Sequence, residues 1–132
     1  MKTLYSILLI SLLTTSGTAG DLAGSFKEAA AQADAQDVTD RAIRIYAEID
    51  LRDYYQQKYN PVFQSCLKST EHPDTSTFSF VVAIGTNGRV LRLYADHETN
   101  MLACIRPTLI KDEFPHPPFS PYYMHTTMSF SK

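Results

Sequence analysis

Alternating hydrophobic residues beside a turn signal constrain the fold of this chain more than any other feature of its sequence. The even-numbered positions of residues 78–84 (FSFVVAI) are all large and apolar, and residues 85–88 read GTNG. Strict alternation is typical of a half-buried strand, and Asn-Gly is the strongest short signal for a hairpin turn. Because residues 90–94 (VLRLY) then run back, the sequence predicts an antiparallel hairpin between residues 78 and 94.

Helical periodicity precedes the hairpin. Hydrophobic residues recur at i, i+3 and i+4 spacing after Asp37, which is placed to cap a helix. They are Val38, Ala42, Ile45, Tyr46 and Ile49. This pattern predicts a helix with one buried stripe that runs to about Lys58. Pro61 is expected to interrupt it and to start a short second helical piece over residues 61–67.

A further helix is expected after the hairpin, and a strand ends the chain. Asp96 or Thr99 can start this helix, and Pro107 predicts a kink or an early break within it. Its buried side is formed by Leu102, Ile105 and Leu109. Residues 114–121 (FPHPPFSP) are too rich in proline for a helix or a central strand, so they form an extended connector. Alternation over residues 122–130 then predicts the final strand.

These elements together predict an α+β domain. A small antiparallel sheet, made of the hairpin and the C-terminal strand, is covered on one face by helices. The length of 132 residues suits a single domain, which we assign to residues 37–132. Residues 20–36 are Ala-rich, with Leu22 and Phe26 as the large apolar anchors. They are expected to form either a loosely docked helix or a frayed leader.

The first residues have the composition of a secretory signal peptide. A positive start is followed by an apolar run over residues 3–13 and by small polar residues, with Gly17 and Ala19 placed for cleavage before Gly20. The apolar run is too short to span a bilayer, so we expect residues 1–19 to be removed and no membrane anchor to remain. The mature chain is therefore expected to be exported and soluble.

Export determines how the two cysteines, Cys66 and Cys104, are interpreted. An even pair of cysteines in an oxidising compartment favours a disulfide, whereas a Cys nucleophile with a His base would leave the second thiol exposed to oxidation. In the entropic model, a bond between Cys66 and Cys104 closes the loop between them and lowers the entropy of the unfolded state, which corresponds to about 4 kcal/mol. We expect the two residues to be bonded.

Several short segments resemble a known family in their identity and order. They are Cys66, Phe80-Val82-Ile84, Gly88-Arg89-Val90, Cys104-Ile105 and Phe114-Pro115-His116-Pro117. Their order resembles the C-terminal domain of TonB-type energy transducers, and most closely the cysteine-bearing subgroup called the AgmX/PglI C-terminal domain. The resemblance covers residues 62–130 and implies a TonB C-terminal-like α+β fold in the periplasm. TonB works through a membrane helix and a Pro-rich spacer that this sequence does not display. The resemblance therefore supports the predicted fold more strongly than it supports a function.

The sequence offers little for catalysis, metal binding or nucleic-acid binding. A formal net charge of −2 provides no basic stripe for phosphates. Nucleophile elbows, P-loops, H-E-x-x-H and Gly-rich dinucleotide turns are absent from it. Asp96-His97-Glu98 contains three metal-capable side chains, but consecutive residues point in different directions, so a helix-entry role is favoured. We therefore expect no enzyme activity, no cofactor and no metal ion.

Tyrosines near element ends are candidates for partner binding. They are Tyr54, Tyr55, Tyr59, Tyr122 and Tyr123, with His125 and Thr127 on the less apolar face of the last strand. Rigid aromatic rings with polar tips are common at recognition surfaces, although half-buried core aromatics would show the same pattern. The last strand is also the candidate sheet edge, to which extended peptides bind by adding a strand.

The expected function is therefore non-enzymatic binding of another protein or peptide in the periplasm. The alternative is an immunity protein that neutralises a toxin delivered into the periplasm. An envelope enzyme is a third class, and it would need convergent polar groups that the sequence does not display.

Overall fold

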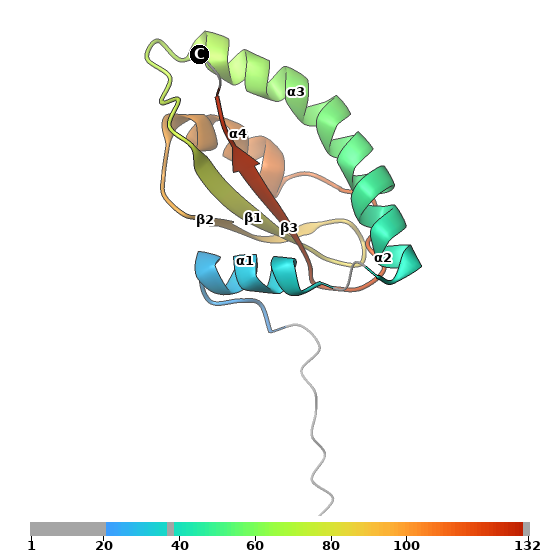
Figure 1. Cartoon of the computed structure of the whole chain (residues 1–132). Helices are drawn as coiled ribbons and strands as arrows, with labels where there is room; N and C mark the ends of the chain where they lie inside the picture. The colour runs from blue at the N-terminus through green and yellow to red at the C-terminus, as the bar shows by residue number, and fades with distance from the viewer. Residues whose placement is uncertain (1–20, 37–38, 131–132) are drawn as a thin grey trace, which may run out of the picture.

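The computed structural model of the chain describes residues 21–36 and 39–130 (Figure 1). The predicted signal peptide, residues 1–19, lies outside the described residues, as do Asp37 and Val38. The elements are α1 (Phe26–Ala35), α2 (Arg41–Ile45), the π-helix η1 (Tyr46–Leu51), α3 (Arg52–Ser69), β1 (Phe78–Ile84), β2 (Val90–Ala95), α4 (Asn100–Ile110) and β3 (Tyr122–Met128). Their arrangement confirms the α+β class.

The sheet has three antiparallel strands in the order β2-β1-β3. Val82 at its centre lies opposite Leu93 of β2 and Met124 of β3. The predicted hairpin and final strand are therefore confirmed, and β3 occupies one edge of the sheet as expected.

Gly88 fixes the hairpin turn against the connector after α4. Its φ of +80° belongs to a region that favours glycine, and a Cβ atom there would lie 2.0 Å from the carbonyl oxygen of Phe114. The Phe114 N–H in turn donates to the Gly88 carbonyl oxygen at 2.8 Å. The turn and the connector can approach this closely only because residue 88 has no side chain.

The larger part of the core lies between one sheet face and helices α3 and α4 (Figure 1). The even-numbered residues of β1 supply this face. From α4 come Met101, Leu102, Ile105 and Leu109, all fully buried. The Cys66 and Cys104 sulfurs are bonded, which confirms the predicted disulfide and joins α3 to α4.

The opposite sheet face is covered by α1, so helices lie on both faces and not on one. Val81 and Ala83 of β1 pack there with Ala23 and Ala29, and Figure 1 shows α1 lying across the sheet on the side away from α3. Ser25 caps the helix by accepting a hydrogen bond from the Glu28 N–H at 3.2 Å. Residues 21–36 are thus a docked part of the domain, which begins before residue 37.

The helix before the hairpin departs from the prediction in two ways. Ile45 and Ile49 are 40% and 51% exposed, whereas Tyr46 and Leu51 are buried. The π-helical turn η1 begins at Tyr46, and its wider turn places Leu51, five residues later, in the core. The predicted interruption at Pro61 is also wrong, since α3 continues through it to Ser69. Burial on both sides of Pro61 and the disulfide to α4 stabilise α3 across the missing backbone hydrogen bond.

Helix α4 begins where the sequence indicates. The hydroxyl of Thr99 accepts a hydrogen bond from the Leu102 N–H at 3.0 Å, so Thr99 and not Asp96 is the N-cap. The helix continues past Pro107 to Ile110, so the early break is not observed. In the described part of the chain, none of the helices combines the length and hydropathy needed to cross a bilayer.

Candidate functional site

A buried carboxylate organises the surface of α3 that faces the connector. Asp112 has a side chain only 1% exposed, and three groups from α3 donate hydrogen bonds to it. Its Oδ1 accepts from the Tyr54 hydroxyl at 2.5 Å and from Lys58 Nζ at 2.6 Å. Its Oδ2 accepts from the Tyr59 hydroxyl at 2.6 Å. This cluster ties the middle of α3 to the segment after α4.

Titration of the cluster follows from these contacts. Burial alone would raise the pKa of Asp112, but hydrogen bonds from Lys58, Tyr54 and Tyr59 outweigh it and hold the pKa below its usual range. Burial and the hydrogen bond to Asp112 raise the pKa of Tyr59. The hydrogen bond to Asp112 also raises the pKa of Lys58. The cluster is therefore an ion pair between Lys58 and Asp112, with two neutral phenols that donate hydrogen bonds to the carboxylate.

Tyr54 and Tyr59, predicted as partner-binding residues, both donate hydrogen bonds to Asp112. Tyr59 is fully buried, and its ring stacks against Phe114 with centroids 6.2 Å apart. Tyr54 is half-buried and meets Phe114 edge to face at 5.6 Å. The sequence did not predict a role for Asp112, because the side chain of an acidic residue just after a helix is normally expected to be exposed to solvent.

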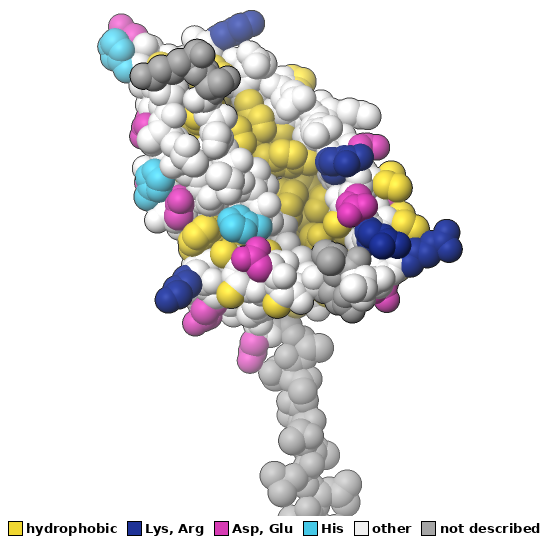
Figure 2. Space-filling model, viewed as in Figure 1, with side chains coloured by type: hydrophobic (Ala, Val, Ile, Leu, Met, Phe, Trp, Pro, Cys, Tyr) yellow, Lys and Arg dark blue, Asp and Glu magenta, His cyan; other side chains and the backbone are white. Residues whose placement is uncertain are grey.

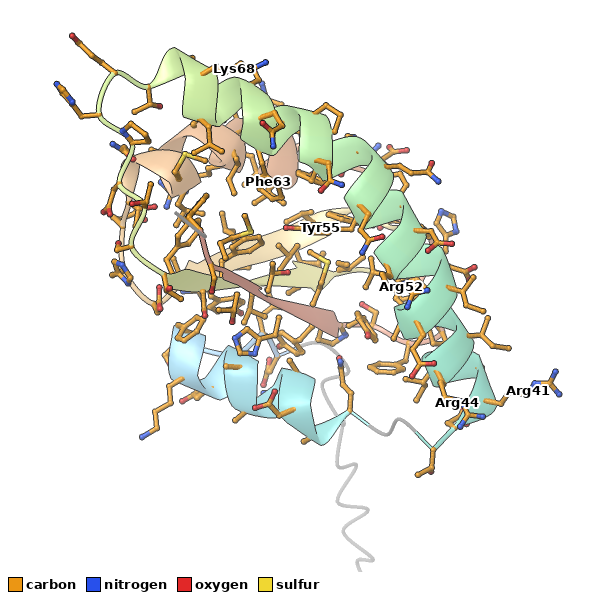
Figure 3. The ribbon with its side chains drawn as sticks, turned by 45° about the horizontal axis from the view of Figure 1, so that its top comes forward. Arg41, Arg44, Arg52, Tyr55, Phe63 and Lys68 are labelled. Atoms are coloured by element: carbon orange, nitrogen blue, oxygen red, sulfur yellow. A yellow bond between two sulfur atoms is a disulfide. The ribbon has the colours of Figure 1, made fainter. Side chains whose placement is uncertain are left out.

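Tyr55 differs from its two neighbours. Its ring stacks on Tyr59 with centroids 4.9 Å apart, yet its buried hydroxyl has no hydrogen-bond partner within the described residues. Burial raises the pKa of Tyr55, and the Thr126 side chain opposes this shift. Figure 3 shows Tyr55 and Phe63 pointing from α3 toward the sheet. Tyr55 therefore faces β3 across the open side of the core.

The residues predicted on β3 divide between interior and surface. Tyr122 and Tyr123 are 6% and 3% exposed, so neither ring offers free surface. Tyr122 meets Tyr46 edge to face at 4.9 Å, and the Tyr123 hydroxyl accepts from the Ala23 N–H at 3.0 Å under α1. His125 and Thr127 are exposed, as expected for the less apolar face of an edge strand.

Contacts with α1 and β1 hold the two exposed side chains in place. His125 lies against the Phe26 ring at 5.9 Å and against the Asp34 carboxylate at 3.7 Å. The Thr127 and Ser79 hydroxyls share a hydrogen bond of 2.8 Å. Both side chains therefore lie on the α1 side of the strand.

The register of β3 shows which of its backbone groups point away from β1. The Ser79 carbonyl accepts from the Asp96 N–H at 3.1 Å, so Ser79 bonds toward β2. Ser79 lies opposite Thr127, which makes this a non-hydrogen-bonded pair whose Thr127 N–H and C=O point away from β1. The same orientation recurs at every second residue, so Tyr123 and His125 also direct their backbone groups outward.

A trough of hydrophobic side chains runs beside this edge. We define the β3–α3 trough by Tyr55 and Phe63 of α3 and by Thr126 and Met128 of β3. Figure 2 shows hydrophobic side chains exposed in a band between the two elements. Among the described residues, α3 and β3 share no pair of Cα atoms within 8 Å. The core is therefore partly open along the edge strand of the sheet.

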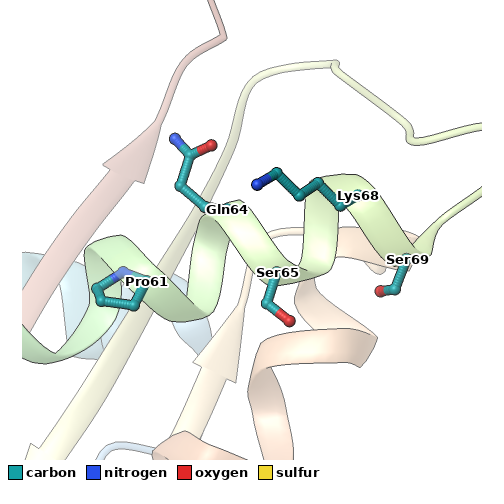
Figure 4. Close-up of a pocket in the computed structure, with 5 residues that line it drawn as sticks. All are labelled: Pro61, Gln64, Ser65, Lys68 and Ser69. Carbon is teal, nitrogen blue, oxygen red and sulfur yellow. The ribbon is translucent and has the colours of Figure 1, made fainter.

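Two other features of the described surface do not combine groups suited to catalysis or metal binding. A depression of about 550 Å³ on α3 is lined by Pro61, Gln64, Ser65, Lys68 and Ser69 (Figure 4). These side chains come from one helix and include no acid or base pair. Near α4, His97 contacts Asp96 at 3.0 Å, whereas Glu98 pairs with Arg106. Within residues 21–36 and 39–130, no group of three His, Cys, Asp or Glu side chains could hold a metal ion.

Comparison with known proteins adds no relative to these observations. The chain matches no protein-family model, no curated protein and no solved structure. The interpretation of the site therefore depends on its own geometry.

Proposed function

We propose that this chain is a non-enzymatic, exported protein-binding domain that captures an extended peptide segment at the edge of β3. The observation that carries the proposal is an outward-facing row of backbone groups directly beside the β3–α3 trough. An added strand would pair with that row and place alternate side chains over the trough.

Two kinds of contact would contribute to such binding. Backbone hydrogen bonds to His125 and Thr127 would give affinity for any extended segment. Tyr55, Phe63 and Met128 would favour segments with apolar residues at every second position, because burying apolar area contributes roughly 25 cal/mol per Å². Binding would also cover the part of the core that the described residues leave open.

The location of the binding is part of the proposal. The disulfide between Cys66 and Cys104 is consistent with an oxidising compartment. The N-terminal sequence pattern and the resemblance to TonB C-terminal domains favour the periplasm. The same resemblance favours a protein or a peptide in the periplasm as the binding partner.

Selection from a phage-displayed library of random linear peptides tests the proposal. We expect enrichment of peptides with alternating apolar residues, whose affinity is then measured by isothermal titration calorimetry. Thr127→Pro removes one outward N–H at a position where proline is tolerated in an edge strand, so binding should weaken at least about tenfold. Thr127→Val is the matched control, since it loses the same hydroxyl but keeps the N–H.

The proposal fails on either of two results. One is enrichment without apolar alternation. The other is equal affinity of the selected peptide for both Thr127 variants when circular dichroism shows that both are folded.

A further inference from the structure

The outward backbone groups of Tyr123 are already occupied. The Gln36 side chain donates from Nε2 to the Tyr123 carbonyl oxygen at 3.0 Å, and its Oε1 accepts from the Tyr123 N–H at 2.7 Å. Gln36 directly follows α1 as its C-cap residue. One side chain therefore satisfies both groups that Tyr123 directs away from β1.

This pair of hydrogen bonds reproduces what a neighbouring strand would supply. In an antiparallel ladder, one residue of the partner strand exchanges both an N–H···O and an O···H–N bond with the residue opposite. A carboxamide carries the same donor and acceptor as a peptide group. Gln36 thus occupies one residue position of an added strand, at the start of β3.

The carboxamide is held there by the docking of α1. At the start of the α1 segment, the Ala23 N–H donates to the Tyr123 hydroxyl and the Ala23 carbonyl accepts from the Tyr94 hydroxyl at 2.6 Å. In the middle of α1, Ala29 is fully buried against the sheet. At its end, the Gln36 N–H donates to the Ala33 carbonyl. The start of the segment is therefore bonded to the strand that Gln36 caps, and the helix backbone positions Gln36 at its end.

We propose that Gln36 caps the edge of β3 at Tyr123 and thereby sets the register of strand addition. An incoming extended peptide pairs through His125 and Thr127 and ends before Tyr123. The register of the peptide rests on the proposed function, whereas the capping of Tyr123 is a property of this chain alone. In this register, the peptide side chain that points away from α1 lies over Tyr55 and Met128, so it is apolar.

Residue-resolved amide hydrogen exchange by NMR tests the capping in the free protein. Gln36→Ala should accelerate exchange of the Tyr123 amide by about tenfold, the factor expected for loss of one hydrogen bond. Gln36→Glu keeps an acceptor for the Tyr123 N–H, so its exchange should stay close to that of the unsubstituted chain. Gln32→Ala is the control, because Gln32 is an exposed residue of the same helix. A retained nuclear Overhauser effect between the Phe26 and His125 rings reports that α1 stays docked.

The selected peptide tests the register. In the unsubstituted chain, the peptide should protect the His125 and Thr127 amides and leave Tyr123 unchanged. In Gln36→Ala, it should protect Tyr123 as well.

Equal exchange of Tyr123 in the unsubstituted chain and in Gln36→Ala with α1 docked overturns the capping. Peptide-induced protection of Tyr123 while Gln36 is present overturns the register. A selection without binders overturns the register together with the proposed function, while exchange in the free protein still decides the capping.

Discussion

Two tyrosines one helical turn apart should respond oppositely to loss of the same atom. The Tyr59 hydroxyl donates to the buried Asp112 carboxylate at 2.6 Å, whereas the buried Tyr55 hydroxyl has no hydrogen-bond partner among the residues that the structure describes. Hydrogen bonds to charged groups contribute about 1.5–3 kcal/mol, and a buried polar group without a partner costs about 1–3 kcal/mol. Tyr59→Phe should therefore lower the free energy of unfolding, and Tyr55→Phe should leave it unchanged or raise it.

The expected sizes make the comparison decisive. Tyr59→Phe should cost about 2 kcal/mol, which for a domain of this size corresponds to a fall in Tm of roughly 8 °C. Tyr55→Phe should change stability by between zero and about +1 kcal/mol. Because both changes remove one hydroxyl from the same helix, differences in helix propensity cancel.

Urea denaturation at neutral pH, followed by circular dichroism with m-values compared, measures both effects. If Tyr55→Phe costs as much as Tyr59→Phe, then the Tyr55 hydroxyl has a partner and the distinction is wrong. If Tyr59→Phe is neutral, then the hydrogen bond to Asp112 does not contribute to stability.

Substitutions at three other positions should also change stability measurably. The folded-state pKa of Asp112 is held below its ordinary value, so the ionised carboxylate stabilises the fold above pH 3.8 and loses this effect as the pH falls through the lowered pKa. Asp112→Asn should therefore be about 3–5 kcal/mol less stable than the unsubstituted chain at neutral pH. Unfolding free energies measured at decreasing pH should show this difference become smaller below pH 3.8. Cys66→Ser should lower the free energy of unfolding, measured in thermal melts, by about 4 kcal/mol. Mass spectrometry of the exported chain should find Cys66 bonded to Cys104, and two free thiols would contradict the disulfide. Gly88→Ala should cost at least about 2 kcal/mol by denaturation because the new Cβ meets the Phe114 carbonyl, whereas Gly24→Ala, with its nearest atom at 3.5 Å, should be tolerated.

Local patterns in the sequence were sufficient for the strands, one cap and the disulfide. Alternation over residues 78–84, the GTNG turn and the final strand are properties of neighbouring residues, and each is present in the structure. Thr99 caps α4 because its hydroxyl is three residues from the N–H that it accepts. The disulfide could be predicted because the sequence has two cysteines and its N-terminal pattern predicts export to an oxidising compartment.

The helices show where local patterns fail. The π-helical turn η1 places Leu51 in the core, and Ile49 of the predicted stripe is exposed. Ile45, which precedes this turn, is exposed as well. α1 docks through small residues such as Ala29 and through hydrogen bonds at its ends, which hydrophobic periodicity does not reveal. Its place on the second sheet face therefore depends on tertiary packing.

The candidate site was predicted in part. The edge position of β3 follows from the order of the elements, and His125 and Thr127 lie on its exposed side. Asp112 and Gln36 could not be found, because Asp112 bonds to Tyr59 across 53 positions and Gln36 to Tyr123 across 87. Such contacts exist only once the chain has folded.

The disulfide and the Asp112 cluster, which hold α3 in place, also fix the width of the gap between α3 and β3. The disulfide holds the C-terminal half of the helix to α4, and the Asp112 cluster holds its middle to the following segment. Both attachments join α3 to α4 or to the segment after it, so the position of the helix does not depend on a bond to β3. We expect the opening to be a preformed slot of constant breadth that admits ligands by side-chain size, and closure of the helix onto the strand to play no part in recognition.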